Sequence, residues 1–156
     1  MIEPAACFAV IAVLGSAVVY GTDVFCAMVQ RPALARVDDQ ALVAVMGNVH
    51  RYGDRRMPIP GVLGIAAAAA SAAFAAASGR WAQAIAAGVA FGLLVVWLAL
   101  YLSVSAPINR QLTAAADQSE PPRNARALQH SWDRVITIRA VLQGLAVTAL
   151  CAALLI

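Results

Sequence analysis

Asp23 is a carboxylate inside the first long apolar segment of the chain, residues 5–29. A charged side chain in a membrane-spanning helix is costly, so it normally faces the bundle interior and often belongs to a functional site. The sequence therefore predicts that Asp23 faces other polar residues. Arg134 or Arg139 of the last segment could neutralise it, which leaves two alternatives, a purely structural ion pair and a functional carboxylate.

The chain has two histidines, His50 and His130, and both lie near polar residues. A histidine base could deprotonate an acidic carbon or a phenol near neutral pH, and nearby arginines would stabilise the oxyanion. The same histidines, together with Asp23 or Asp54, could instead bind iron, copper or zinc through imidazole and carboxylate ligands. Because their spacing matches no known ligand motif, the cofactor stays open between none and a metal ion such as iron or copper.

These residues belong to a strongly apolar chain of 156 residues, of which 62% are hydrophobic and 12% charged. Soluble domains are nearer one quarter charged, so the composition predicts an integral membrane protein with one domain, residues 1–156. The net charge of +3 is dispersed and without a recognition motif, which predicts no nucleic-acid partner. The expected partners are the lipid bilayer and a lipophilic small molecule.

Four apolar segments stand out at 5–29, 59–78, 81–105 and 136–156, each close to the ~20 residues that cross a bilayer. Only Gly79 and Arg80 separate the second and third segments, which indicates a tight hairpin. The expected fold is therefore an all-α bundle of four transmembrane helices. Gly88 and Gly92 of the third segment would allow close helix packing, including packing between copies in a homo-oligomer.

The two long connections also contain helical patterns. Apolar residues in 37–52 recur at helical spacing, which predicts a short interfacial helix that ends near Gly53 and at the latest before Pro58. Pro107 is expected to end the third span. Asn124 is a candidate N-cap for a last helix whose polar first turns would extend into the cytoplasm.

The arginines predict the orientation in the cytoplasmic membrane. They gather in the two long connections and the start of the last span, namely Arg31, Arg36, Arg51, Arg55, Arg56, Arg110, Arg123, Arg126, Arg134 and Arg139. By the positive-inside rule, both long loops are cytoplasmic and both termini lie outside.

Helical phase predicts how the polar residues meet. Tyr20 and Asp23 share one stripe of the first span, His130 and Arg134 share a stripe of the last helix, and Trp132 and Arg139 form a neighbouring stripe. All of these positions lie towards the cytoplasmic end. We therefore expect a common polar pocket that faces the cytoplasm.

Three short motifs resemble a known family: residues 20–33, which end in Arg-Pro-Ala; residues 106–112, which contain Asn109; and the run from Trp132 to Arg139. With the span layout, they resemble the small four-helix membrane proteins related to anthrone oxygenases, long catalogued as a domain of unknown function. Characterised relatives oxidise anthrones to anthraquinones. The resemblance implies a site that contains Asn109, Trp132, Arg134 and Arg139.

Two functional hypotheses follow. The first is an oxygenase that acts on a flat lipophilic phenolic or polyketide-like substrate, which would enter from the membrane or from the cytoplasmic interface. Its catalytic residues would be His50, His130, Asn109 and Arg134, and its substrate-binding residues Tyr20, Asp23, Trp132 and Arg139; a metal would use His50, His130, Asp23 and Asp54. The second is a non-catalytic bundle that binds a lipid or quinone, or an accessory subunit of a membrane complex.

Overall fold

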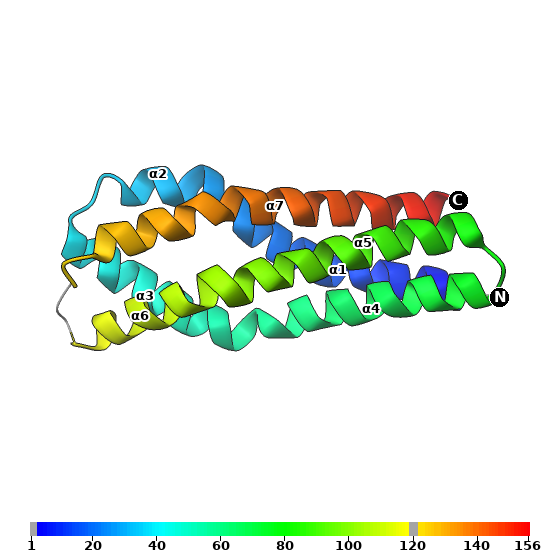
Figure 1. The fold of residues 1–156 in the computed structure, drawn as a ribbon, viewed down its shortest axis with the longest axis horizontal. Helices are drawn as coiled ribbons and strands as arrows, with labels where there is room; N and C mark the ends of the chain where they lie inside the picture. Colours follow the sequence, from blue (N-terminus) through cyan, green and yellow to red (C-terminus); the bar gives the residue numbers. More distant parts are fainter. Residues whose placement is uncertain (1–2, 119–121) are drawn as a thin grey trace.

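The computed structural model describes residues 3–118 and 122–156, and every regular element in these two ranges is helical. The elements in chain order are α1 (Pro4–Phe25), the π-helix η1 (Cys26–Gln30), α2 (Arg31–Leu34), α3 (Asp39–Arg56), α4 (Pro58–Ala77), α5 (Trp81–Leu100), the π-helix η2 (Tyr101–Ser105), α6 (Ala106–Gln118) and α7 (Ala125–Leu155) (Figure 1).

Four helical stretches are long and apolar enough to cross a membrane: Pro4–Leu34, Pro58–Ala77, Trp81–Gln118 and Ala125–Leu155. They cover the four predicted segments to within one residue at the ends, so the expected four-helix membrane fold is confirmed. Three of the stretches continue well past the predicted spans, and these extensions build a second layer of helices at one end of the molecule.

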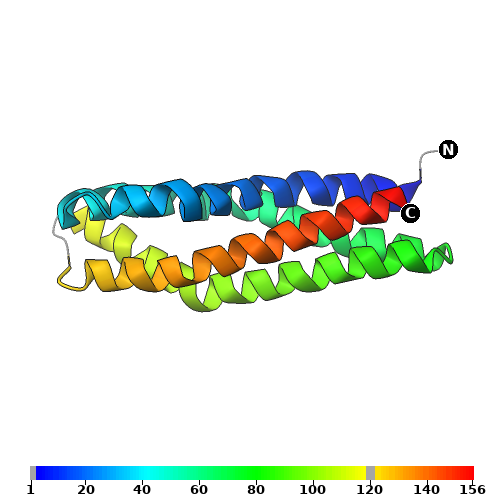
Figure 2. The ribbon, with the colours of Figure 1, turned by 90° about the horizontal axis from the view of Figure 1, so that it is seen from above.

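The four long helices form a ring in which α1 packs between α4 and α7, and α5 packs against the same two helices. Figures 1 and 2 show the start of α1, the end of α7 and the α4–α5 turn at one end of the bundle, called here the terminal end. The opposite end, called here the loop end, contains α2, α3, α6 and the beginning of α7. There α3 packs along α6.

Small residues allow the helices to pack closely in the terminal half of the bundle. Its buried core contains Ala12, Ala67, Ala68, Ala90, Leu94, Ala146 and Leu150. In this half α1 and α4 cross closely, so that a methyl group on Gly15 would lie 2.8 Å from the Pro60 carbonyl oxygen and 2.9 Å from the Gly64 nitrogen. Because lipid is as apolar as a leucine side chain, such close van der Waals packing is a main source of helix association in a membrane.

Pro107 does not end the third helical stretch, so that prediction is wrong. η2 ends two residues before Pro107, and the Ala106 N–H donates to the Tyr101 carbonyl, five residues back. The first stretch repeats this arrangement, because η1 ends two residues before Pro32 and the Arg31 N–H donates to Cys26. Proline lacks an N–H and clashes with the carbonyl four residues back, and the wider π turn lets both helices continue through it.

The predicted interfacial helix is α3, which runs past Gly53 and ends before the Met57–Pro58 step. The Asp38 carboxylate caps it by accepting a 2.8 Å hydrogen bond from the Ala41 N–H. Its buried residues, which include Leu42 and Met46, pack in one cluster with Ile108 and Leu112 of α6. The apolar face of α3 is therefore covered by α6 and does not need lipid to cover it.

The last helix begins at Ala125, as predicted, with Asn124 in the N-cap position. The Asn124 side chain makes no capping hydrogen bond within the described parts of the chain. Asn124 therefore occupies the expected N-cap position without capping the helix through its side chain. The first turns of α7 are instead held by Arg126, whose guanidinium donates to the carbonyls of Leu34 (3.0 Å) and Val37.

Candidate functional site

Asp23 of α1 and Arg139 of α7 form an ion pair in the middle of the bundle. The Arg139 Nη2 donates to the Asp23 Oδ1 at 2.8 Å, and the two residues are only 3% and 5% exposed. Asp23 Oδ2 accepts from the Gln143 amide at 2.6 Å and from the Trp97 indole N–H at 3.3 Å. Both carboxylate oxygens thus have donors, as a buried charge requires.

The Arg139 guanidinium is surrounded by three aromatic rings. Its carbon lies 5.9 Å from the Trp97 ring centre, 5.5 Å from Tyr101 and 5.9 Å from Trp132. Its Nη1 donates to the Ser105 hydroxyl at 2.8 Å. Cation–π contacts of this kind strengthen when water is excluded. Arg139 therefore fixes the position of the aromatic rings from α5, η2 and α7.

A second polar network begins at Asp54, near the end of α3. Its Oδ1 accepts from the Tyr101 hydroxyl and from the Asn109 amide, both at 2.8 Å. The Asn109 amide oxygen in turn accepts from the Trp132 indole N–H at 3.0 Å. The network joins α3, η2, α6 and α7. Since Tyr101 and Trp132 also face Arg139, it continues the ion-pair cluster towards the loop end.

His50 lies on α3 one turn before Asp54 and is 4% exposed. Its ring centre is 5.5 Å from that of Trp132, and no described residue makes a hydrogen bond to its buried Nε2. Burial lowers the pKa of His50 from its ordinary value of 6.5 to about 4; Asp54 opposes this shift and Arg139 adds to it. His50 is therefore neutral near pH 7 and can accept a proton.

A cavity of about 290 Å³ lies where these residues meet. Its polar wall includes Asp23, His50, Asp54, Asn109 and Arg139, and the indole rings of Trp97 and Trp132 line it as well. The remaining lining comes mainly from apolar side chains of α1, α4 and α5. Apolar walls with a few convergent polar groups are typical of small-molecule sites.

Six of the residues predicted for the site line this cavity, namely Asp23, His50, Asp54, Asn109, Trp132 and Arg139. Three predicted residues lie elsewhere. His130 is exposed and lines a separate surface hollow with Arg31 and Asp133. Arg134 is exposed and donates to the Ser131 hydroxyl at 3.1 Å, and Tyr20 packs its ring against Gly144.

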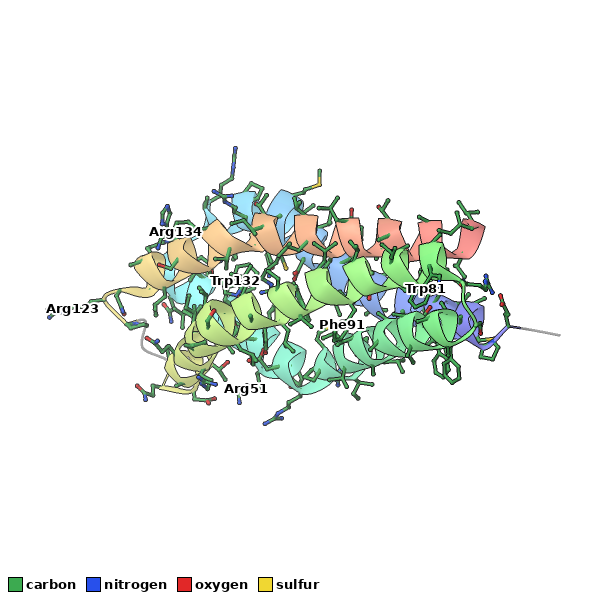
Figure 3. All side chains as sticks on the ribbon, turned by 45° about the vertical axis from the view of Figure 1, so that its right-hand side comes forward. Arg51, Trp81, Phe91, Arg123, Trp132 and Arg134 are labelled. Carbon is green, nitrogen blue, oxygen red and sulfur yellow. The ribbon has the colours of Figure 1, made fainter. Side chains whose placement is uncertain are left out.

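The misplacement of His130 and Arg134 follows from helix geometry. Each residue of an α-helix is rotated by about 100° from the one before, so residues two positions from Trp132 point away from the face that Trp132 occupies. Figure 3 shows Trp132 and Arg134 on different sides of α7. The expectation that the His130–Arg134 stripe faces the pocket is wrong, and the inward stripe contains Trp132, Arg139 and Gln143.

The proposed metal ligands do not come together. His130 lies outside the cavity that holds His50, Asp23 and Asp54. Within residues 3–118 and 122–156, no group of three or more His, Cys, Asp or Glu side chains is placed to hold a metal ion. The four-residue metal site expected from the sequence is therefore not formed by these residues.

The structure adds three residues that were not selected as site residues from the sequence: Trp97, Tyr101 and Gln143. Trp97, Tyr101 and Ser105 follow one another at steps of four along α5 and η2, and Arg139 and Gln143 are also four apart. Polar or aromatic side chains at such steps share one helix face. The four-residue spacing of polar and aromatic side chains within apolar spans could therefore have identified Trp97, Tyr101 and Gln143 from the sequence.

Comparison with protein-family models, with curated proteins and with solved structures gives no match.

Proposed function

We propose that this protein is a membrane-embedded oxygenase of the anthrone oxygenase type, which oxidises a flat lipophilic phenolic or polyketide-like substrate inside the cavity. The observation that carries the proposal is His50. It is a neutral imidazole in the cavity wall, and its Nε2 has no partner among the described residues. The motifs around Arg31-Pro32, Asn109 and Trp132, which resemble that family, support the same assignment.

The reaction needs a base and dioxygen. His50 Nε2 removes a proton from the acidic CH₂ carbon, and dioxygen adds to the resulting carbanion, so that a C–O bond forms and dioxygen is reduced to a peroxide. The His50 proton returns to that peroxide. Loss of the remaining C–H proton and cleavage of the O–O bond then release water and leave a ketone on the carbon. A side-chain base positioned at the reacting carbon accelerates such proton transfers, and the lowered pKa of His50 keeps its imidazole unprotonated near pH 7 while making it a weaker base.

The other site residues hold this arrangement in place. Asn109 fixes the Trp132 indole that lies against His50, and Asp54 fixes Asn109. Arg139 is already neutralised by Asp23, so we assign it to holding the aromatic wall instead of binding the substrate oxyanion. His130 and Arg134 take no part in the reaction, because both are exposed outside the cavity.

The distribution of arginines supports an orientation in which both long connections face the cytoplasm and the ends of the chain lie outside. The cavity then lies towards the cytoplasmic side of the membrane. Gly88 and Gly92 have no described atom within 4 Å of an added methyl group. Their face is therefore free for lipid or for a second copy, and the homo-oligomer stays a prediction.

A non-catalytic bundle that binds a lipid or quinone is the second candidate. The observation that favours it is the complete pairing of Asp23, which has a donor for each oxygen and needs no ligand. Such a protein would bind its ligand in the same apolar cavity without altering it chemically.

The test is turnover of an anthrone by the purified protein in detergent or nanodiscs, followed as dioxygen-dependent formation of the quinone. We expect His50→Ala to abolish turnover and the matched variant His130→Ala to retain it. Quinone binding without turnover in the wild-type protein would favour the second candidate. Equal activity of the two histidine variants would overturn the role of His50.

A further inference from the structure

We infer that the cavity is loaded sideways from the bilayer, through an apolar opening between α4 and α5, by an uncharged flat ligand dissolved in the membrane. The inference rests on the proposed function for the chemical class of the ligand only. The route itself rests on where the lining residues of the cavity are exposed.

Val62 of α4 and Leu102 of η2 line the cavity and are also among the most exposed large side chains, at 64% and 58%. Leu98, one turn before Leu102, is half-buried and lines the cavity as well. α4 and α5 are neighbours in the ring of helices. A side chain that both lines the cavity and is exposed lies at an opening. Thr22, Val49 and Pro58 also meet this criterion, but Val62 and Leu102 are the most exposed large hydrophobic side chains of the lining, so we place the lateral opening at them.

Within the expected spans 59–78 and 81–105, Val62 and Leu102 each lie three residues from the end, so we place the mouth at the loop-end edge of the hydrocarbon. Val62 belongs to the stretch Pro58–Ala77 and Leu102 to Trp81–Gln118, both of which are apolar enough to span a membrane. A rim of branched aliphatic side chains offers no hydrogen bond to a charged or strongly hydrated ligand. A neutral aromatic molecule, by contrast, would pass from lipid tails to the rim without losing any hydrogen bond.

At its polar end the opening is bridged by a hydrogen bond. The Tyr101 hydroxyl, next to Leu102 in the chain, donates to Asp54 at 2.8 Å, and Pro58, one turn after Asp54, precedes Val62 by another turn. Asp54, Pro58 and Val62 are thus spaced four residues apart. The hydrogen bond from Tyr101 lies at the Asp54 end of this series, and the aliphatic rim of the cavity lies at the Val62 end. A ligand entering at the rim meets the aromatic wall first and the His50–Asn109 region last.

The experiment follows ligand entry and not turnover. A Trp81→Phe background leaves two tryptophans, Trp97 and Trp132, and both line the cavity. In vesicles we expect membrane-dissolved 9,10-anthraquinone to quench this fluorescence in a saturable manner, and the water-confined anthraquinone-2-sulfonate to give no saturable quenching. In this background, the rim variant Val62→Phe/Leu102→Phe should lose the saturable component.

The matched control is Leu63→Phe/Val96→Phe, which adds the same bulk to exposed positions of α4 and α5 that do not line the cavity. It should quench like the parent. Equal quenching in the rim and control variants, or saturable quenching by the sulfonate, would overturn the lateral route. Quenching without any anthrone turnover would retain the route and reject the oxygenase, so the two failures are distinguishable.

Discussion

The two halves of the bundle are stabilised in different ways. In the terminal half, alanines and glycines bring α1 and α4 into backbone contact, and the few polar contacts are single ties such as the Ser71 hydroxyl on the Ala5 carbonyl at 2.9 Å. In the loop half, α3 and α6 also approach closely at Gly47, but around the cavity the helices are joined by hydrogen bonds, which connect Asp23 with Arg139 and Asp54 with Asn109. Closely packed helices leave no space for a ligand, whereas helices joined by hydrogen bonds between long side chains leave space for a cavity.

The contrast explains where function can reside in a chain of this size. In lipid, helices associate through van der Waals packing and interhelical hydrogen bonds, because apolar burial alone gives little. The terminal half relies mainly on van der Waals packing, and the region around the cavity relies mainly on interhelical hydrogen bonds. Four changes test this division, from the largest expected effect to the smallest.

The first change removes the central charge of the loop half. Asp23→Leu leaves the Arg139 guanidinium buried without its counter-ion, which we expect to cost about 3–5 kcal/mol in the free energy of unfolding. Arg139→Met should cost less, because a carboxyl can become neutral by binding a proton and a guanidinium cannot. Unfolding in mixed detergent measures both. Recovery in the double variant Asp23→Leu/Arg139→Met would confirm that the unpaired charge causes the loss, and an unstable double variant would contradict it.

The second change is one of pH and concerns His50. Its pKa is about 4 in the folded protein and 6.5 ordinarily, so between these values the unfolded chain binds a proton that the folded chain does not. Stability is therefore full above pH 6.5 and falls as the pH decreases towards 4, by on the order of 3 kcal/mol.

Unfolding curves measured from pH 7 to pH 4 check this expectation. His50→Ala should remove most of the decrease in this window. His130→Gln, which changes the exposed histidine, should keep it. An unchanged slope in His50→Ala would show that another group causes the pH dependence.

The third change tests the packing of the terminal half. Gly64→Ala places a methyl group 2.7 Å from the Ser16 hydroxyl and 3.1 Å from the Ser16 nitrogen, so the helices must separate. Overpacking of this kind costs about 1–3 kcal/mol. Gly92→Ala is the matched control, because its methyl group would meet no described atom. We expect it to be neutral or to stabilise by up to ~1 kcal/mol through helix propensity. Thermal unfolding that ranks the two variants the other way would refute the close crossing.

The fourth change is the smallest. Tyr101→Phe removes the hydroxyl that donates to Asp54, while Asp54 keeps its hydrogen bond from Asn109. We expect a loss of about 0.5–1.5 kcal/mol in the free energy of unfolding. Asn109→Leu, which also frees the Trp132 indole N–H, should cost more. An identical loss in both variants would show that the network does not extend to Trp132.

The sequence predicted the four spans well, because hydropathy depends on composition along a segment and needs no knowledge of neighbours. It also identified Asp23 and two possible partners for it, of which Arg139 forms the ion pair. It could not choose between Arg134 and Arg139. Each arginine belongs to a polar stripe on a different face of α7. Because both stripes are polar, polarity alone does not show which of the two faces the bundle interior.

The partners of Asp23 on α5 were harder to find. Trp97 looks like an ordinary apolar residue of a span, and only its indole N–H, aimed at Asp23 across 74 positions in the chain, makes it part of the site. The two histidines offered as alternative metal ligands are separated for a related reason: they are similar in type, yet His50 lines the cavity and His130 is exposed outside it. Burial of a single side chain is a tertiary property that sequence spacing leaves undetermined.

The two π turns have an evolutionary consequence. Each contains one extra residue per turn compared with the helix around it, and each contributes residues to the cavity wall, Cys26 and Gln30 from η1 and Tyr101 and Leu102 from η2. π-bulges of this kind are frequent at functional sites. A wider turn at these positions can absorb an added residue in the cavity wall while the α-helix before it keeps its register. Substitutions that reshape the cavity for a new ligand can accumulate without forcing the alanine-rich half to repack.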